Sequence, residues 1–367
     1  MESLASQLAP PAIQKLQPYQ SARRIGGNGH LWLNANELEK NLTHEISPVP
    51  LNRYPDFLPQ QLAETYRQYA GLADPKRETA NSFHHAIAVR GADEAIDLLI
   101  RAFCQPGKDR LMICPPTYGM YEFCANAHGV DVIKAPLKDN FQLDLDAIKA
   151  SVHQANLLFL CSPNNPTGNL IDVEDIREVL NHTRQSTLVA VDEAYIEFAP
   201  QNTIVDLLED YPNLIVIRTL SKAFGLAAVR CGFLLCHESV MKIIQRLVAP
   251  YPIPDPSARI SLAALSLQGV TGMQQAVDRL ISTREVFAAK LRAIPCISTV
   301  FPSHTNFILV KAEKLGDRNL FEYLLDQGIV TRDQSHDPAL SGCLRITIGE
   351  PESMAEVAAA IEQYQSA

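Results

Sequence analysis

Short apolar runs alternate with longer amphipathic stretches between about residues 85 and 236. The apolar runs have the length of buried strands and lie at 85–90, 110–114, 130–134, 157–161, 188–192, 214–219 and 232–236. The stretches between them predict helices, as at 93–104, where Ile96, Leu99, Ile100 and Phe103 follow helical spacing. This alternation is typical of βα units that build a mostly parallel sheet. The sequence therefore predicts a doubly wound α/β fold for this part of the chain.

The remainder of the chain follows a different pattern. Helical stretches cover about 257–293, and shorter segments predict a strand at 306–310, a helix at 320–327, a strand at 344–348 and a helix at 352–364. A proline-rich segment at 250–256 precedes them, and proline stops helices and removes hydrogen-bond donors from sheets. We therefore expect an N-terminal arm with part of a small domain at 1–45, a large α/β domain at 46–255 and a small α+β domain at 256–367.

Length and charge narrow the classes of protein. The chain has 367 residues, which at roughly 150 residues per domain suggests two domains. It carries 32 Lys and Arg against 41 Asp and Glu, a net charge of −9, so its surface gives no general attraction to nucleic acid or anionic lipid. No apolar run approaches the ~20 residues that span a bilayer, and no secretory signal is apparent. We expect a cytoplasmic protein that holds any anionic ligand locally.

Cysteine and histidine give no metal-site signature. The eight cysteines form no C-x-x-C pair and mostly lie in apolar runs, which predicts buried, reduced thiols. The adjacent His84 and His85 would face opposite sides of a strand, and no other histidines form a ligand pair at helical spacing. We therefore expect no metal ion.

The informative residues lie where predicted strands end, at the edge where open α/β sheets bind ligands. Asp192 ends an apolar strand, where a buried carboxylate needs a cationic partner; a helix N-cap is the alternative. Lys222 follows the next strand, and desolvation together with a nearby cation such as Arg230 would lower the pKa of its amine and make it a nucleophile. A solvated surface lysine is the alternative.

Two further loops reach the same edge. Residues 91–94 join a strand to a helix, so their free amides form an anion site, although Asp93 could equally be a plain N-cap. Asn165 lies in the turn 162–168 and presents an amide side chain. One ligand would use all these groups: an aromatic cofactor with a ring nitrogen for the carboxylate, an aldehyde for the lysine, and a phosphate for the helix terminus, a serine and an arginine. Pyridoxal phosphate has this chemistry.

Three motifs resemble the fold-type I aminotransferases in their order and spacing. They are Asn-Pro-Thr-Gly at 165–168, Asp-x-x-Tyr at 192–195 and Ser-Lys-x-Phe-Gly at 221–225. Further segments narrow the resemblance to the histidinol-phosphate aminotransferase family, and these lie at 18–24, 33–37, 53–56 and 344–347. The resemblance covers essentially the whole chain. It departs at 227–230, where Ala-Ala-Val-Arg replaces the expected Ala-Gly-Leu-Arg, which affects only local packing because Arg230 keeps its place.

The resemblance implies a role for each residue around the cofactor ring. Lys222 would bind pyridoxal phosphate covalently and move the proton between the substrate Cα and the cofactor. Asp192 would keep the pyridine nitrogen protonated, so that the ring accepts electrons. Tyr195 and Asn165 would hydrogen-bond the 3-hydroxyl oxygen, and Tyr118 would stack on the ring. Core tyrosines and a turn asparagine are the alternatives.

The resemblance also implies residues for the two anionic groups. The cofactor phosphate would be bound by the amides of Ala92 and Asp93 and by Ser221 and Arg230. Tyr54 would reach the same phosphate from the other subunit of a homodimer. The substrate side would be formed by Arg345, Arg332, Tyr19 and Asn36. A surface ion pair is the alternative for Arg332, and an ordinary loop tyrosine is the alternative for Tyr54.

Three functions remain open at this stage. The resemblance favours an aminotransferase that moves an amino group from L-histidinol phosphate to 2-oxoglutarate. The alternatives on the same scaffold are a decarboxylase of a phosphorylated amino acid, such as threonine phosphate, and an aromatic amino acid aminotransferase. The bond that is cleaved depends on which bond lies perpendicular to the cofactor ring, and no motif encodes that alignment. A regulatory cofactor-binding module would ordinarily carry a basic DNA-binding segment, and none precedes residue 30 or follows residue 350.

Overall fold

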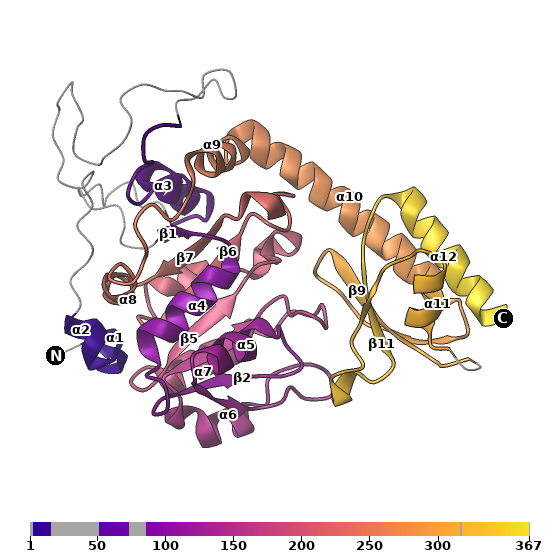
Figure 1. Ribbon diagram of the computed structural model, residues 1–367. Coiled ribbons are helices and arrows are strands. Elements are labelled where there is room, and N and C mark those ends of the chain that lie inside the picture. The colour runs from indigo at the N-terminus through magenta and orange to yellow at the C-terminus, as the bar shows by residue number, and fades with distance from the viewer. Residues whose placement is uncertain (1–2, 16–50, 73–85, 316–317, 367) are drawn as a thin grey trace.

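The computed structural model describes residues 3–15, 51–72, 86–315 and 318–366 (Figure 1). Tyr19, Asn36 and the segments 18–24 and 33–37 lie outside the described residues. Figure 1 places the two ends of the chain at opposite ends of the molecule. Within the described ranges, no helix has the length and apolar character needed to cross a membrane.

A seven-stranded sheet forms the centre of the larger part. Its strands are β1 (Ala86–Val89), β2 (Arg110–Ile113), β3 (Asp131–Lys134), β4 (Leu157–Cys161), β5 (Leu188–Asp192), β6 (Leu214–Thr219) and β7 (Gly232–Cys236), in the order β1-β7-β6-β5-β4-β2-β3. Only β7 runs against its neighbours β1 and β6, and the other pairings are parallel. The predicted mostly parallel sheet is confirmed, and the four strands from β4 to β7 match their predicted ranges.

Helices cover both faces of this sheet, which is why its strands read as continuous apolar runs. One face packs on α4 (Ala92–Phe103), α5 (Met120–Ala127) and α8 (Glu238–Ile244), with α1 (Leu4–Leu8) beside α8 and α2 (Pro11–Lys15) after it. The other face packs on α3 (Gln60–Tyr69), α6 (Leu145–Ser151) and α7 (Val173–Thr183). Alternate residues of each strand therefore belong to different cores. In β4, Phe159 packs on the face that α4, α5 and α8 cover, and Leu158 packs on the face that α3, α6 and α7 cover.

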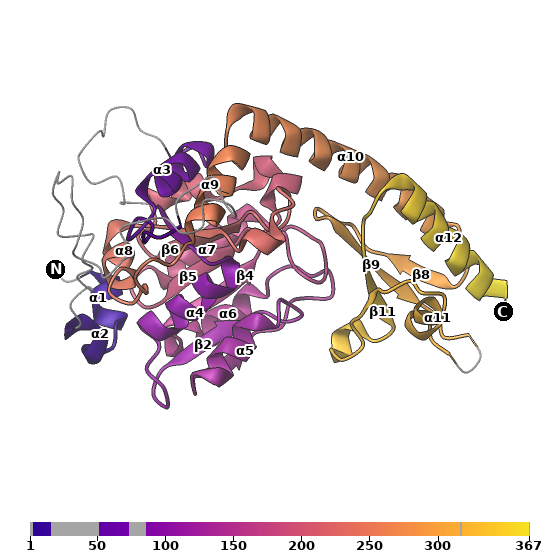
Figure 2. The same cartoon turned by 45° about the horizontal axis from the view of Figure 1, so that its top comes forward.

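A four-stranded antiparallel sheet forms the smaller part. Its strands are β8 (Ile297–Val300), β9 (Phe307–Ala312), β10 (Arg332–Asp333) and β11 (Cys343–Thr347), in the order β10-β11-β9-β8. They pack with α10 (Leu267–Arg292), α11 (Leu320–Asp326) and α12 (Pro351–Ser366) around a separate core that includes Phe287, Leu324 and Ile361. Figure 2 shows α10 running from α9 (Asp255–Ala264), beside the large sheet, to the smaller one.

Candidate functional site

Asp192 ends β5 as predicted, and its carboxylate is almost fully buried, with 2% of the residue exposed. Its Oδ2 accepts a hydrogen bond from the Tyr121 hydroxyl at 2.9 Å, and its Oδ1 accepts one from the Ala194 amide at 3.0 Å. Burial outweighs these bonds and raises the pKa of Asp192 to about 6. The carboxylate is therefore held in a fixed orientation in surroundings that favour a positive ligand group beside it.

Lys222 follows β6, the neighbour of β5 in the sheet, so both side chains emerge at the same edge. Its Nζ lies 5.4 Å from the centre of the Tyr195 ring. The side chain of Lys222 is exposed to solvent, but the residues around it partly desolvate its ammonium group. This desolvation, together with the charge of Arg345, lowers the pKa of Lys222. A lysine with a lowered pKa has a larger fraction of free amine, as a nucleophile or a base requires.

The first turn of α4 and the loop before β7 meet through Asp93 and Arg230. The Arg230 Nη2 lies 3.4 Å from Asp93 Oδ2, and the Tyr118 hydroxyl donates to Asp93 Oδ1 at 3.0 Å. Asp93 thus acts through its side chain as well, a contact that the sequence did not predict. The charge of the guanidinium is held beside the free amides at the start of α4, where an anion is stabilised.

Two glycines permit this approach. Gly91 has φ +79°, and a Cβ there would lie 2.8 Å from Arg230 Nη2. Gly232 begins β7 directly against this turn, where a Cβ would lie 2.7 Å from the Gly91 carbonyl carbon. Ser221 comes two residues after Thr219, which pairs with Gly232, and the Ser221 hydroxyl accepts a hydrogen bond from the Thr219 hydroxyl at 3.0 Å. The start of α4 therefore offers free amides, a hydroxyl and a guanidinium within one small region.

Arg345 brings the small sheet to this site. In β11 the side chains of Leu344 and Ile346 enter the small core, so Arg345 between them faces the other way. Its Nη1 donates to the Asn165 Oδ1 at 2.5 Å, across 180 positions of sequence, and its Cζ lies 5.3 Å from the centre of the Phe307 ring. Desolvation lowers the pKa of Arg345, and Arg332, its antiparallel neighbour in register, acts in the same direction. The structure thus joins Asn165, Arg345 and Arg332 in one cationic corner.

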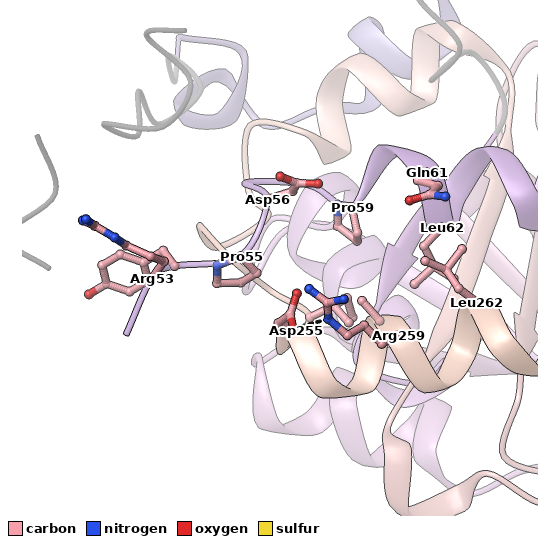
Figure 3. A pocket seen from close by; sticks show the side chains of 12 residues that line it. Arg53, Pro55, Asp56, Pro59, Gln61, Leu62, Asp255, Arg259 and Leu262 are labelled. Atoms are coloured by element: carbon pink, nitrogen blue, oxygen red, sulfur yellow. Dashed lines mark hydrogen bonds and ion pairs between the residues drawn. The ribbon is translucent and has the colours of Figure 1, made fainter. Parts of the chain in front are cut away.

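Tyr54 lies elsewhere in this subunit. It is 51% exposed and stacks on Tyr251, with 4.5 Å between the ring centres. It lines a hollow of about 410 Å³ between the segment before α3 and the start of α9, and the described lining includes none of the residues around Asp192. Figure 3 shows this hollow, with Asp255 and Arg259 paired and Arg53 extending outward.

Two residues of the site were missed by the sequence analysis. Tyr121 is fully buried and donates to Asp192, and its ring stacks on Phe159 with 4.7 Å between centres. Phe307 lies edge-on to Tyr195 with 5.3 Å between ring centres. Its spacing from Tyr118 could have identified Tyr121. It lies three residues further along the chain, and the two rings contact each other edge-on with 5.6 Å between their centres. Phe307 carries no sequence signal beyond that of a core residue in a strand.

Comparisons with known proteins identify the family of the chain. A family model described as aminotransferase class I and II matches residues 29–361. The histidinol-phosphate aminotransferase of Escherichia coli (strain K12) is 46% identical over 358 residues, which cover 98% of each chain. The solved histidinol-phosphate aminotransferase from Clostridium acetobutylicum superposes with a TM-score of 0.78 at 25% identity, covering 86% of this chain and 91% of that one.

A second solved structure shares the fold. The Sinorhizobium meliloti histidinol-phosphate aminotransferase in complex with pyridoxal-5'-phosphate gives a TM-score of 0.74 at 24% identity, covering 86% of this chain and 83% of that one. Because the sequence identity is only 24%, this likeness shows the shared fold and nothing further. The family match and the full-length relative reach further, since they cover nearly all of the sequence. The chain therefore belongs to the aminotransferase class I and II family, and within it to the histidinol-phosphate aminotransferases.

Proposed function

We propose that this protein transfers an amino group between L-histidinol phosphate and 2-oxoglutarate, giving imidazole acetol phosphate and L-glutamate, in histidine biosynthesis. The observation that carries the proposal is the 46% identity to an enzyme of that name over 98% of both chains. Paralogues with another reaction would be expected to match at lower identity or over a shorter length. The same observation ranks this reaction above a decarboxylase or an aromatic aminotransferase on the same fold.

The donor set fits pyridoxal phosphate as cofactor. A buried carboxylate on Asp192 suits a protonated ring nitrogen, and Lys222 has the lowered pKa that condensation with an aldehyde requires. The amides of Ala92 and Asp93 at the start of α4, with Ser221 and Arg230, suit a phosphate. When bound, the cofactor supplies an electron-accepting ring conjugated to the substrate Cα.

The chain's own residues supply orientation and proton transfer. Within each half-reaction, Lys222 Nζ would move one proton between the substrate Cα and the cofactor carbon joined to the substrate nitrogen, in one direction in the first half and in the other in the second, and its lowered pKa suits both steps. Tyr195 and Asn165 hydrogen-bond the ring's 3-hydroxyl oxygen, and Tyr118 stacks on the ring face. Both Tyr195 and Asn165 are buried and therefore held in place before substrate arrives, which supports an orienting role.

Arg345 recognises an anion in both half-reactions. Glutamate has carboxylates and histidinol phosphate has none, so the same guanidinium binds a carboxylate in one case and a phosphate in the other. Arg332 lies opposite Arg345 in the antiparallel register and adds a second positive charge. Tyr19 and Asn36 complete the substrate side in this proposal, although both lie outside the described residues.

Homodimerisation and location in the cytoplasm belong to the same proposal. Tyr54 is half exposed, and the described lining of its hollow contains none of the other proposed cofactor residues, which supports its reaching the cofactor phosphate of a second subunit. A twofold interface would make that exchange reciprocal. The division at 45 and 255 is part of the same proposal: α9 begins at Asp255, within the proline-rich segment, and packs on the core of the large sheet, and α10 leads from there to the small sheet.

Labelling of the cofactor lysine tests the proposal. Borohydride reduction of the yellow protein, followed by peptide mapping, should place the pyridoxyl group on Lys222. Lys242→Ala, which removes a surface lysine paired with Glu238, is the matched control and should leave labelling and turnover unchanged. Label at another lysine, together with normal turnover by Lys222→Ala, would overturn the site.

A panel of amino donors tests the reaction. Histidinol phosphate should be the best donor among histidinol phosphate, phenylalanine, tyrosine and threonine phosphate, with 2-oxoglutarate converted to glutamate. Release of carbon dioxide from threonine phosphate, with no glutamate formed from histidinol phosphate, would instead establish the decarboxylase.

A further inference from the structure

A buried polar cluster lies directly behind the cofactor site. Arg218 on β6 is 4% exposed, and its Nε donates to Glu193 Oε2 at 2.7 Å. Glu193 also accepts from the Thr203 hydroxyl at 3.1 Å and from the Ile204 amide at 2.8 Å. Glu193 therefore has a full set of donors and one close cationic partner. It follows Asp192 directly in the chain, so the cluster is fixed to the carboxylate that faces the cofactor.

Glu197 lies in the same cluster with a different environment. It sits in the short 3₁₀ turn η3 (Ile196–Phe198), two residues after Tyr195, and is 5% exposed. Within the described part of the chain, neither of its carboxyl oxygens makes a hydrogen bond of good geometry: the nearest guanidinium nitrogen, Arg218 Nη1, is 3.7 Å away, and the Tyr69 hydroxyl on α3 is the other donor that faces it. The fully buried Tyr66 hydroxyl on α3 also lacks a partner there.

The charges of this cluster do not balance if both carboxyl groups are ionised. One guanidinium would then face two carboxylates, and its closest contact is already with Glu193. A buried carboxylate without donors is costly, whereas a neutral carboxylic acid is tolerated and can donate one hydrogen bond. With Glu197 neutral, Arg218 and Glu193 balance each other.

We propose that Glu197 is a positioning residue that, as an uncharged acid, packs between Arg218 and Tyr69 and so keeps the turn after Asp192, which carries Tyr195, in place behind the cofactor site. The expected effect of Glu197 on the cofactor site rests on the proposed function, whereas the expected charge state of Glu197 does not. The cluster reaches the lysine loop as well, because Tyr69 on α3 lies edge-on to Phe224, two residues after Lys222, with 5.5 Å between ring centres. Because Tyr69 also faces Glu197, the cluster contacts both the turn that carries Tyr195 and a side chain that packs on the lysine loop.

Surrounding groups support the neutral form. Burial raises the pKa of Glu197 to about 7, opposed chiefly by the charge of Arg218 and reinforced by Glu193. From α3, the titratable groups that face it are Tyr66 and Tyr69, and the pKa of each is raised by burial. From α10, the apolar side chains of Met273 and Val277 belong to the same core as Tyr195 and Phe198 of this turn. The facing charges are thus those of Arg218 and Glu193.

Urea unfolding of the holoenzyme between pH 5 and pH 8 tests the charge state. A carboxyl whose pKa is raised in the folded state stabilises the fold below its unfolded pKa and loses that contribution as pH rises through the folded value. Glu197→Gln keeps the shape and stays neutral, so it should match wild type at pH 5 and be more stable at pH 8, by on the order of 100-fold in the unfolding constant. Glu193→Gln, the matched control, should be less stable at every pH.

The positioning role has its own measurements. Glu197→Gln should retain kcat within about twofold and leave the pH titration of the bound cofactor's visible absorption unchanged. Glu197→Leu is similar in volume but has no polar atoms. It should shift that titration and lower kcat about tenfold with KM nearly constant, because the turn loses the polar contacts of Glu197 with Arg218 and Tyr69.

Two results would overturn the inference. One is a loss of stability in Glu197→Gln at pH 8 comparable with that in Glu193→Gln, which would make Glu197 an ionised partner of Arg218. The other is a Glu197→Leu protein with wild-type absorption and kcat, or, if that variant does not fold, a Glu197→Gln protein with an altered absorption titration. A wild-type protein that binds no pyridoxal phosphate would contradict the proposed function instead, while the unfolding series would still decide the charge of Glu197.

Discussion

Removal of the Tyr121 hydroxyl isolates one interaction of the site. This hydroxyl is one of two donors to the Asp192 carboxylate, at 2.9 Å. The ring itself is fully buried and stacked on Phe159 at an interplanar angle of 3°. Tyr121→Phe therefore keeps the volume and the stacking and removes only the hydrogen bond.

The magnitude follows from the charge of the acceptor. A hydrogen bond to a charged group contributes about 1.5–3 kcal/mol, and 1.36 kcal/mol corresponds to one pKa unit. The pKa of Asp192, already raised by burial to about 6, should therefore rise by roughly one to two further units in the variant. A carboxyl with a higher pKa ionises only at higher pH, so the variant loses its negative charge in a range where wild type still holds it.

Cofactor affinity should report this change, because in the proposed site a protonated ring nitrogen would bind the ionised form of Asp192. Dissociation constants for pyridoxal phosphate, measured from pH 5 to pH 9, should weaken toward acid in both proteins. The midpoint of that weakening should lie roughly one to two pH units higher in Tyr121→Phe. Tyr118→Phe is the matched control, since it removes a tyrosine hydroxyl three residues earlier, just before α5, which donates to Asp93 and not to Asp192. Equal midpoints in wild type and Tyr121→Phe, or an equal shift in Tyr118→Phe, would refute the reasoning.

Three further outcomes are expected. Asp192→Asn should fold and bind the cofactor, yet single-turnover measurements should show proton abstraction slower by several orders of magnitude; a small change would indicate an N-cap role. Arg345→Ala should lower kcat/KM for both glutamate and histidinol phosphate at least tenfold, as a charge-assisted contact of about 1.5–3 kcal/mol implies; a loss for one substrate alone would exclude a shared anion site. Lys222→Ala and Tyr54→Ala, refolded together, should form hybrids with one wild-type site; activity that stays at the average of the two, with hybrids demonstrated, would place Tyr54 in its own subunit's site.

The strands could be predicted because their burial is nearly complete. Every residue of β4, β5 and β7 is buried, so each reads as an uninterrupted apolar run whose ends mark the strand ends. β8 gives a weaker signal, since its two central residues are exposed, and β10 contains only two residues. Their positions are set by pairing with β9 and β11, which are tertiary contacts that local patterns do not encode.

Site residues divide in the same way. The positions of Asp192 and Lys222 were predictable because Asp192 ends one buried strand and Lys222 follows the next, and the ends of parallel strands share one edge of the sheet. The partners that set their pKa values lie far away in sequence: Tyr121 is 71 residues from Asp192, and Arg345 acts on Lys222 across the two sheets. Such contacts follow from the packing of whole layers, so the residue types were readable but their electrostatic environment was not.

Asp192, at the end of β5, and the next residue, Glu193, are both buried carboxyl groups, but in the described part of the chain only Glu193 has a cationic side chain beside it. Glu193 has Arg218 as a resident cation at 2.7 Å, and its charge is neutralised within the protein. Asp192, one residue earlier, receives two hydrogen bonds, and in the described ranges no arginine or lysine forms an ion pair with it, so its pKa remains raised. A buried carboxylate that is oriented by donors but left without a cation is stabilised when a ligand brings one. In the proposed site, a protonated ring nitrogen would supply the cation that Asp192 lacks, and this ion pair would contribute to cofactor affinity, whereas Arg218 already supplies that cation to Glu193.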